Sequence, residues 1–252
     1  EDARPVADSL SLDINGVLAV QHATALTHQQ FLDCPEKILQ EYYAEVTDLV
    51  QSLTGASRVE AFAHHIRCGR ALAHARGCDG YVCYAHNDYT VESGPQRVRD
   101  LYSPLCPMAS PDEVAQHLKQ RYMIINVWRS VGEQPVQMMP LAVCDGSTLE
   151  EADCIRFSAV HKDRVGHTYA CCFNERQRWL HFSGLQRHEV IVMKCYDSAE
   201  TPGVVRWGAH TAFHDPRTQQ DAPSRDSIDV RCLAFFLDSD EVRTALPASR
   251  LK

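Results

Sequence analysis

Lysine is scarce in this chain, and so are long runs of any one kind of residue. Only 5 of the 252 residues are lysine against 20 arginines, and the formal charge is −8. Without a basic run, such a chain lacks the positive surface that nucleic acid or an anionic membrane requires. No stretch approaches the roughly 18 consecutive apolar residues of a membrane span. We therefore expect a small-molecule substrate, with no nucleic-acid partner and no membrane partner.

Paired cysteines and a hydrolase nucleophile motif are also lacking. The 11 cysteines are odd in number and scattered, with no C-x-x-C among them. Zinc ribbons and disulfide frameworks both need short, paired spacings, so neither is indicated. Reduced thiols in a cytoplasmic protein fit this pattern better. No G-x-S-x-G elbow points to a serine hydrolase.

The expected elements are few helices and many short strands. Apolar side chains three to four positions apart predict a helix over 28–55, and the capping pattern Ser110-Pro111-Asp112-Glu113 predicts a short one to about Gln120. Alternating and apolar segments predict strands at 58–66 and 80–90. Further strands are expected at 121–129, 136–144, 167–173, 177–183, 188–197, 204–210 and 227–237, with a hairpin turn at 174–176.

This order of elements predicts a mainly β fold with flanking α-helices, a double-stranded β-helix of the jelly-roll or cupin-like kind. The chain shows no internal repeat and no linker. We expect one domain over 1–252, made of a helical N-terminal addition at 1–56, a barrel at 57–237 and a C-terminal tail at 238–252.

A jelly-roll barrel can hold iron(II) with two histidines and one carboxylate, leaving coordination positions open. His-x-Asp suits this task because residues i and i+2 of a strand point to the same side. The motif occurs twice, at His86-Asn87-Asp88 and at His161-Lys162-Asp163. Counting four strands up to the distal histidine favours His86 and Asp88, and the charged surroundings of the second motif suggest a loop. The second motif stays open as an alternative.

Two histidines compete for the distal position. His210 ends an apolar strand, whereas His214 precedes Asp215-Pro216, where the chain is expected to turn away. His210 is therefore the preferred third metal ligand, and His86, Asp88 and His210 together form the expected catalytic metal site.

An arginine and a serine follow at the start of the last strand. Arg225 and Ser227 share one strand face, so a guanidinium and a hydroxyl could jointly hold the far carboxylate of 2-oxoglutarate. Arg231 lies further along the same face and is the alternative, and a salt-bridged barrel arginine remains the plain structural interpretation. We also place Tyr122 with the co-substrate ligands. The polar, aromatic and charged segment 126–129 supplies the expected substrate pocket residues Asn126, Trp128 and Arg129.

Six blocks follow one another between about Arg58 and Phe236: His86-Asn87-Asp88-Tyr89-Thr90, Asn126-Val127-Trp128-Arg129, Pro140-Leu141-Ala142-Val143-Cys144-Asp145, Met193-Lys194-Cys195-Tyr196-Asp197-Ser198, His210-Thr211-Ala212-Phe213 and Arg225-Asp226-Ser227-Ile228-Asp229-Val230-Arg231. In this order the chain resembles the hydroxylase/desaturase family of fungal non-haem iron(II)/2-oxoglutarate-dependent oxygenases. That family includes proteins like aspergillic-acid hydroxylase, gibberellin desaturase-like proteins and the cephamycin methoxylase-related protein.

The resemblance implies a dioxygenase that uses Fe(II), 2-oxoglutarate and O2. It implies His86, Asp88 and His210 as iron ligands, and it strengthens Arg225 and Ser227 as co-substrate ligands. The expected reaction is hydroxylation, desaturation or oxidative ring closure at an unactivated C–H bond of a small secondary-metabolite precursor, with amino acids and other carboxylates among the candidates. Two alternatives stay open: a non-haem iron enzyme that does not use 2-oxoglutarate, and a non-catalytic cupin-like binding protein.

Overall fold

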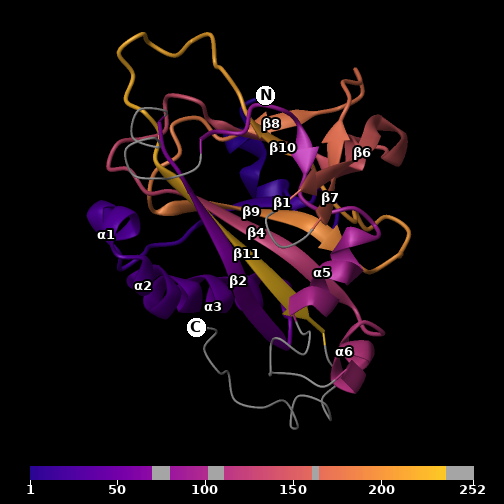
Figure 1. Ribbon diagram of the computed structural model, residues 1–252. Coiled ribbons are helices and arrows are strands. Elements are labelled where there is room, and N and C mark those ends of the chain that lie inside the picture. Colours follow the sequence, from indigo (N-terminus) through magenta and orange to yellow (C-terminus); the bar gives the residue numbers. More distant parts are fainter. Residues whose placement is uncertain (70–79, 102–110, 161–164, 237–252) are drawn as a thin grey trace.

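Two antiparallel sheets form the body of the molecule (Figure 1). The computed structural model describes residues 1–69, 80–101, 111–160 and 165–236. The strands are β1 (Val17–Gln21), β2 (Arg58–Arg67), β3 (His86–Asn87), β4 (Tyr122–Ser130), β5 (Leu141–Cys144), β6 (Cys154–Val160), β7 (Val165–Cys171), β8 (Trp179–His181), β9 (Glu189–Asp197), β10 (His210–Ala212) and β11 (Ser227–Phe235). Five strands make a sheet in the order β1-β9-β4-β11-β2, and the other six make a second sheet in the order β6-β7-β3-β10-β5-β8.

Helices cover the outer face of the five-stranded sheet. They are α1 (His28–Asp33), α2 (Pro35–Lys37) and α3 (Tyr43–Thr54), with a π-helical turn at Ile38–Tyr42 between the last two. In Figure 1 they follow one another in a row, with α3 nearest to β2. A capping box begins α1, where the Thr27 hydroxyl accepts from the Gln30 amide at 3.2 Å and the Gln30 side chain accepts in return at 2.9 Å. Two further helices, α5 (Ser93–Leu101) and α6 (Pro111–His117), lie near the other end of the sheet.

Alternation along the central strands gives each strand one face that packs into the core and one face that lies toward the pocket between the sheets. All nine residues of β4 are buried. Ile125 and Val127 pack into the core against the helices, whereas Asn126 and Trp128 face a pocket between the two sheets. Because successive side chains of a strand point to opposite faces, one sequence segment serves both the core and the site.

A buried ion cluster fixes the far end of β9. The Lys194 ammonium, which has no exposed surface, lies 2.7 Å from the Asp197 carboxylate and 3.1 Å from Asp13. Arg121 completes the cluster at 2.8 Å from Asp197. A buried charge is tolerated only when it is paired, so these contacts are essential to this end of the sheet.

The predicted jelly-roll fold is confirmed, and several element predictions need correction. The expected helical addition at 1–56 also contains β1, which pairs with β9 as an edge strand of the main sheet. The segment at 80–90 pairs only over β3, and 204–210 pairs only at its last residue. A left-handed Gly203 (φ 83°) comes just before that segment, and the Gly208 amide bonds to the carbonyl of Lys194 in β9, a strand of the other sheet.

Besides β1, two further elements were missed and one turn was misassigned. The two elements are β6, in which Arg156 and Ser158 alternate with apolar residues, and α5, whose apolar pattern is weak. The turn at 174–176 joins β7 to β8, but these strands are not neighbours, so it closes no hairpin. The expected tail at 238–252 lies outside the described residues.

Candidate metal centre and active site

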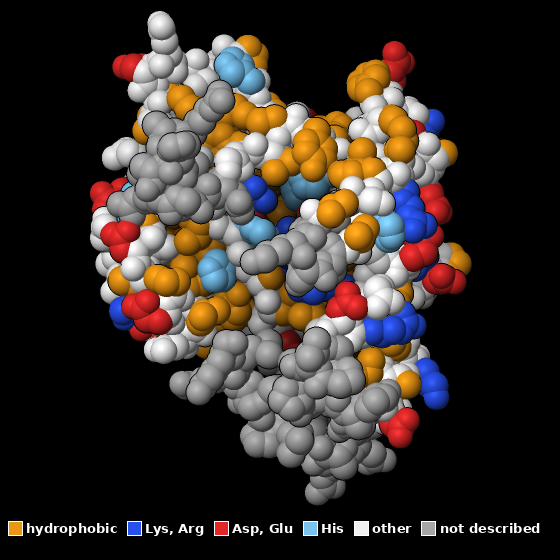
Figure 2. All heavy atoms as spheres, in the orientation of Figure 1, with side chains coloured by type: hydrophobic (Ala, Val, Ile, Leu, Met, Phe, Trp, Pro, Cys, Tyr) orange, Lys and Arg blue, Asp and Glu red, His pale blue; other side chains and the backbone are white. Residues whose placement is uncertain are grey.

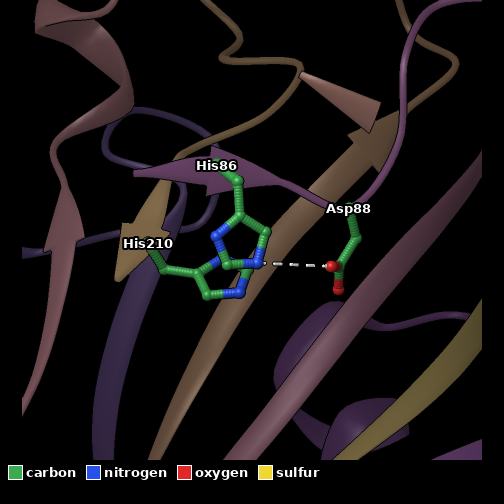
Figure 3. Close-up of side chains that lie close together, drawn as sticks. All are labelled: His86, Asp88 and His210. Atoms are coloured by element: carbon green, nitrogen blue, oxygen red, sulfur yellow. Dashed lines mark ion pairs between the residues drawn. The ribbon is translucent and has the colours of Figure 1, made fainter. Parts of the chain in front are cut away.

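Two histidines and one aspartate converge between the sheets. His86 and His210 lie directly opposite each other on the neighbouring strands β3 and β10, with ring centroids 4.4 Å apart. Asp88 follows β3 and brings its Oδ1 to 3.7 Å from His86 Nε2 (Figure 3). One possible ligand atom from each residue lies within 4.8 Å of the other two. This donor set, with one open side, is the pattern of non-haem iron(II) sites.

A backbone contact favours one tautomer of the His86 ring. Its Nδ1 lies 2.9 Å from the carbonyl oxygen of Tyr84. A carbonyl can only accept, so Nδ1 is the donor here, and in the neutral ring the lone pair lies on Nε2. That nitrogen is the one facing Asp88, so the tautomer suits metal binding.

Asp88 is held by its other oxygen. Oδ2 accepts from Arg231 Nε at 3.1 Å and from Asn126 Nδ2 at 3.2 Å, and Arg231 Nη2 forms an ion pair with it at 3.1 Å. Burial on its own would raise the pKa of Asp88, but the positive charge of Arg231, aided by the two histidines, holds that pKa well below its usual range. Asp88 is therefore a carboxylate with Oδ1 left for a metal ion.

His210 is kept neutral by its surroundings. Burial, followed by the proximity of His86, lowers the pKa of His210 to about 3. A neutral imidazole is the form that binds metals, so the site needs no proton release from this residue near neutral pH.

The three residues line a pocket with about 420 Å³ of empty space, part of it open to solvent. Arg225 also lines it, 4% exposed, with its guanidinium 4.5 Å from the ring centre of Tyr81 and 5.2 Å from that of Trp128. Nη1 donates to the Met139 carbonyl, while Nε has no partner. Burial lowers the pKa of Arg225 to about 10. Among the described residues no carboxylate pairs with it, so this is a buried cation suited to an anionic ligand.

The structure places the remaining predicted residues in different surroundings. Asn126, Trp128 and Arg231 line the pocket, but Arg231 is engaged with Asp88 and with His65 Nε2 at 3.0 Å. Ser227 is not a lining residue. Its hydroxyl is nevertheless buried without a partner, two residues from Arg225.

Arg129 and Tyr122 do not line the pocket, and their predicted positions need correction. Arg129 belongs to the outer face of β4, where it donates to the Tyr42 hydroxyl at 2.9 Å and to the His22 carbonyl at 2.7 Å. Tyr122 lies on the inner face but at the far end of β4, stacked on Tyr196 at 5.7 Å. Arg129 is excluded from the pocket because alternate residues of a strand point to opposite faces, and Tyr122 is excluded because it lies too far along β4.

The alternative ligand candidates were His161 with Asp163, and His214. His161 and Asp163 lie outside the described residues. His214 is exposed and not part of the triad. Six strands, not the expected four, lie between β3 and β10 along the chain. The two additional strands are β6, which was not predicted, and β5, which is a full member of its sheet.

Sequence reasoning missed two charged lining residues, Arg67 and Asp229. Arg67 Nε lies 3.5 Å from Asp229 Oδ2, and both residues lie on paired strands. The alternation of β11 could have indicated Asp229, which lies between Ser227 and Arg231 on their face. Arg67 comes from the end of β2 and is placed only by the pairing of that strand with β11.

Comparisons with known proteins agree with this geometry. A family model described as "Oxidoreductase/YMDC permease-like domain" matches residues 1–235. The Fe(II)/2-oxoglutarate-dependent dioxygenase nvfI of Aspergillus novofumigatus is 33% identical over 239 residues, which cover 93% of this chain and 81% of that protein. The chain belongs to the Fe(II)/2-oxoglutarate-dependent dioxygenase family.

Further relatives of this dioxygenase support the assignment. The hydroxylase/desaturase poxK of Penicillium oxalicum is 28% identical over 268 residues, covering 96% of this chain and 78% of its own. A solved structure of the iron and alpha-ketoglutarate-dependent endoperoxidase NvfI matches with a TM-score of 0.81 at 30% identity, over 93% of this chain and 84% of that one. The predicted family, the oxidoreductase activity and the use of iron, 2-oxoglutarate and O2 are thereby confirmed. In the part of the dioxygenase that the structure describes, no helix is both long enough and apolar enough to span a membrane.

Proposed function

We propose that His86, Asp88 and His210 hold the iron(II) of this dioxygenase and that Arg225, with Ser227, holds the distal carboxylate of 2-oxoglutarate. The observation that carries the second assignment is the buried guanidinium of Arg225, which lines the pocket and has no anionic partner in the part of the chain that the structure describes. Leaving such a charge unpaired is unfavourable, and a carboxylate would satisfy both its free Nε and the buried Ser227 hydroxyl.

The protein groups have separate tasks in this proposal. His86 and His210 offer neutral nitrogens, and Arg231 and Asn126 keep Asp88 oriented by its second oxygen. When bound, iron(II) supplies the oxidative chemistry in which 2-oxoglutarate and O2 are consumed and succinate and carbon dioxide are released. The chain's own contribution is to bind and orient the co-substrate and the substrate and to enclose them in the pocket. Arg231 is committed to Asp88, so Arg225 is the better of the two predicted carboxylate ligands.

The reaction proposed for the substrate is oxidation of an unactivated C–H bond in a small secondary-metabolite precursor, by hydroxylation, desaturation or ring closure. Relatives named as hydroxylase/desaturase and as an endoperoxidase support this range of outcomes. We also propose a cytoplasmic location, which the thiols support, since all nine cysteines in the described ranges are free.

Anaerobic titration tests the residue assignments. Iron(II) is added to the protein and then 2-oxoglutarate, and the weak visible charge-transfer band of the chelate is recorded. We expect the band in the wild type and in Arg176→Ala, a control because its side chain is 51% exposed and paired only with Glu150 and Asp153. Asp88→Ala should bind iron poorly and show no band. A normal band and normal succinate formation by Asp88→Ala would contradict the proposed site.

A further inference from the structure

An apolar wall stands beside His86. The ring of Tyr84, 52% exposed, has its centroid 4.9 Å from the His86 ring and 6.2 Å from the Phe157 ring. Ile155, 58% exposed, is in register with Ala170, which is in register with His86. Side chains directly opposite in antiparallel strands share a face, and Phe157 is two residues from Ile155. Tyr84, Ile155 and Phe157, here called the hairpin wall, therefore lie on the same side as His86.

The hairpin wall continues the opening of the pocket toward solvent. Figure 2 shows a hollow with histidine and arginine atoms at its bottom and hydrophobic atoms gathered over β6 and β7 at its side. Large apolar side chains exposed next to a reactive centre are typical of a ligand-binding surface.

The charges of the pocket exclude a second carboxylate. Three arginines line it: Arg231 is paired with Asp88, Arg67 lies 3.5 Å from Asp229, and Arg225 is assigned to 2-oxoglutarate. Among the described lining residues no cation is left for an anionic substrate. An unpaired carboxylate would be poorly tolerated there, whereas an uncharged apolar skeleton would cover the wall.

We infer that the primary substrate is an uncharged, largely apolar molecule whose skeleton lies on the hairpin wall, and that Tyr84 and Phe157 determine specificity. This inference rests on the proposed function, because it assigns Arg225 to the co-substrate. It selects among the substrate classes left open by the sequence and disfavours amino acids and other carboxylates.

The test compares two probes that differ only in charge, the tricyclic acid abietate and its methyl ester. Their binding is measured by equilibrium dialysis under anaerobic conditions with saturating iron(II) and 2-oxoglutarate. We expect the ester to bind at least about 10-fold more tightly than the acid. Tyr84→Ser and Phe157→Ser should each weaken ester binding by about 5- to 20-fold. The control Phe173→Ser, which removes a ring that is 85% exposed, should change it less than 2-fold.

Tighter binding of the acid, no binding of the ester, or unchanged ester binding in both wall variants would overturn the inference. The charge-transfer band is recorded in the same samples. Its absence in the wild type would count against the proposed function, whereas a normal band without the expected probe binding would count against the wall alone. The Tyr84 variant keeps the backbone carbonyl that orients His86.

A different observation concerns the base of the same hairpin. Cys154 and Cys171 are directly opposite each other on β6 and β7, with sulfur atoms 3.9 Å apart. The Cys172 amide bonds to the Asp153 carbonyl at 2.8 Å, one residue outside the pair, so the pair itself is of the non-hydrogen-bonded kind. The Cα atoms of such pairs are about 4.5 Å apart, within the range that a disulfide spans.

Both thiols are only partly buried, so oxidants can reach them. A hydrogen bond from Cys171, together with one from the indole of Trp207, lowers the pKa of Cys154. Cys154 is therefore the thiol that ionises and attacks more readily.

We propose that Cys154 and Cys171 form a reversible cross-strand disulfide by exchange with a small disulfide such as oxidised glutathione. The Cys154 thiolate attacks one glutathione sulfur and releases one glutathione thiol. Cys171 then displaces the second glutathione, so the two cysteines lose two electrons and two protons and two reduced glutathione molecules form. The new bond closes the base of the hairpin that carries the wall.

Peptide mass spectrometry after incubation with oxidised glutathione tests this. We expect a Cys154–Cys171 crosslink that dithiothreitol removes, and a mixed disulfide with glutathione on Cys154 in Cys171→Ser. A Cys34→Ser control, in which another partly buried thiol is removed, should leave the crosslink unchanged. Finding only glutathione adducts in the wild type, another pairing, or no oxidation of either residue would overturn the proposal.

Discussion

Replacing Arg225 with methionine separates two effects of its buried charge: the loss of folding stability and the binding of 2-oxoglutarate. The ordinary pKa of arginine is about 12.5, and burial lowers the pKa of Arg225 to about 10. The unfolded chain therefore holds this proton more tightly than the folded chain does. At about 1.4 kcal/mol for each tenfold change, the charged form opposes folding at neutral pH by roughly 3 kcal/mol. Contacts with Tyr81, Trp128 and the Met139 carbonyl are lost in the variant. We expect a net stabilisation of about 1 to 2 kcal/mol without ligand.

The same substitution should damage the enzyme. Removing one partner of a buried charge pair costs about 2 kcal/mol or more, so the KM for 2-oxoglutarate should rise at least about 30-fold. Denaturant unfolding of metal-free protein gives the first quantity, and succinate formation at varied 2-oxoglutarate gives the second. Added 2-oxoglutarate with iron should stabilise the wild type and not the variant. A destabilised Arg225→Met with a KM within 3-fold of the wild type would refute the reasoning and make this arginine structural.

Three further variants test other parts of the structure. Arg231→Gln should weaken iron affinity about 10- to 100-fold, because Asp88 loses its anchor, while the KM for 2-oxoglutarate at saturating iron stays within about 3-fold; the reverse pattern would return Arg231 to the co-substrate. Lys194→Ala should lower the free energy of unfolding by about 3 kcal/mol, measured with denaturant, because it leaves a buried carboxylate short of a partner; a change below about 1 kcal/mol would contradict this. The Arg4 guanidinium holds the pKa of Glu189 below its ordinary value, so this stabilisation is present above about pH 4.5 and is lost as the pH falls through the lower folded pKa. Glu189→Gln should cost about 1 kcal/mol at pH 7 and little near pH 3, and an equal cost at both would argue against the ion pair.

Local sequence patterns indicated the three proposed metal ligands, whereas the positions of other pocket residues depended on how the strands pair. His-x-Asp places two ligands on one side because a strand alternates, and the apolar segment that ends at His210 indicated the third, although the strand β10 begins there. The predicted number of strands between them was wrong, yet the structure brings His86, Asp88 and His210 close together, and their role as metal ligands stays a prediction. Arg129 was misplaced because a polar residue in a buried strand was taken to face the pocket, whereas it bonds to Tyr42 and backbone carbonyls on the helix side.

The sequence by itself indicated the class of fold and the candidate ligands through alternation and short motifs, and the family through the resemblance of six ordered blocks. Only the tertiary structure distinguished the surroundings of the two arginines: Arg231 reaches Asp88 across the barrel, and no carboxylate among the described residues pairs with the buried Arg225. It also brought Tyr84 and Phe157 together beside His86. Contacts between residues distant in sequence depend on strand register and on which sheet each strand joins, and neither is encoded in a local pattern.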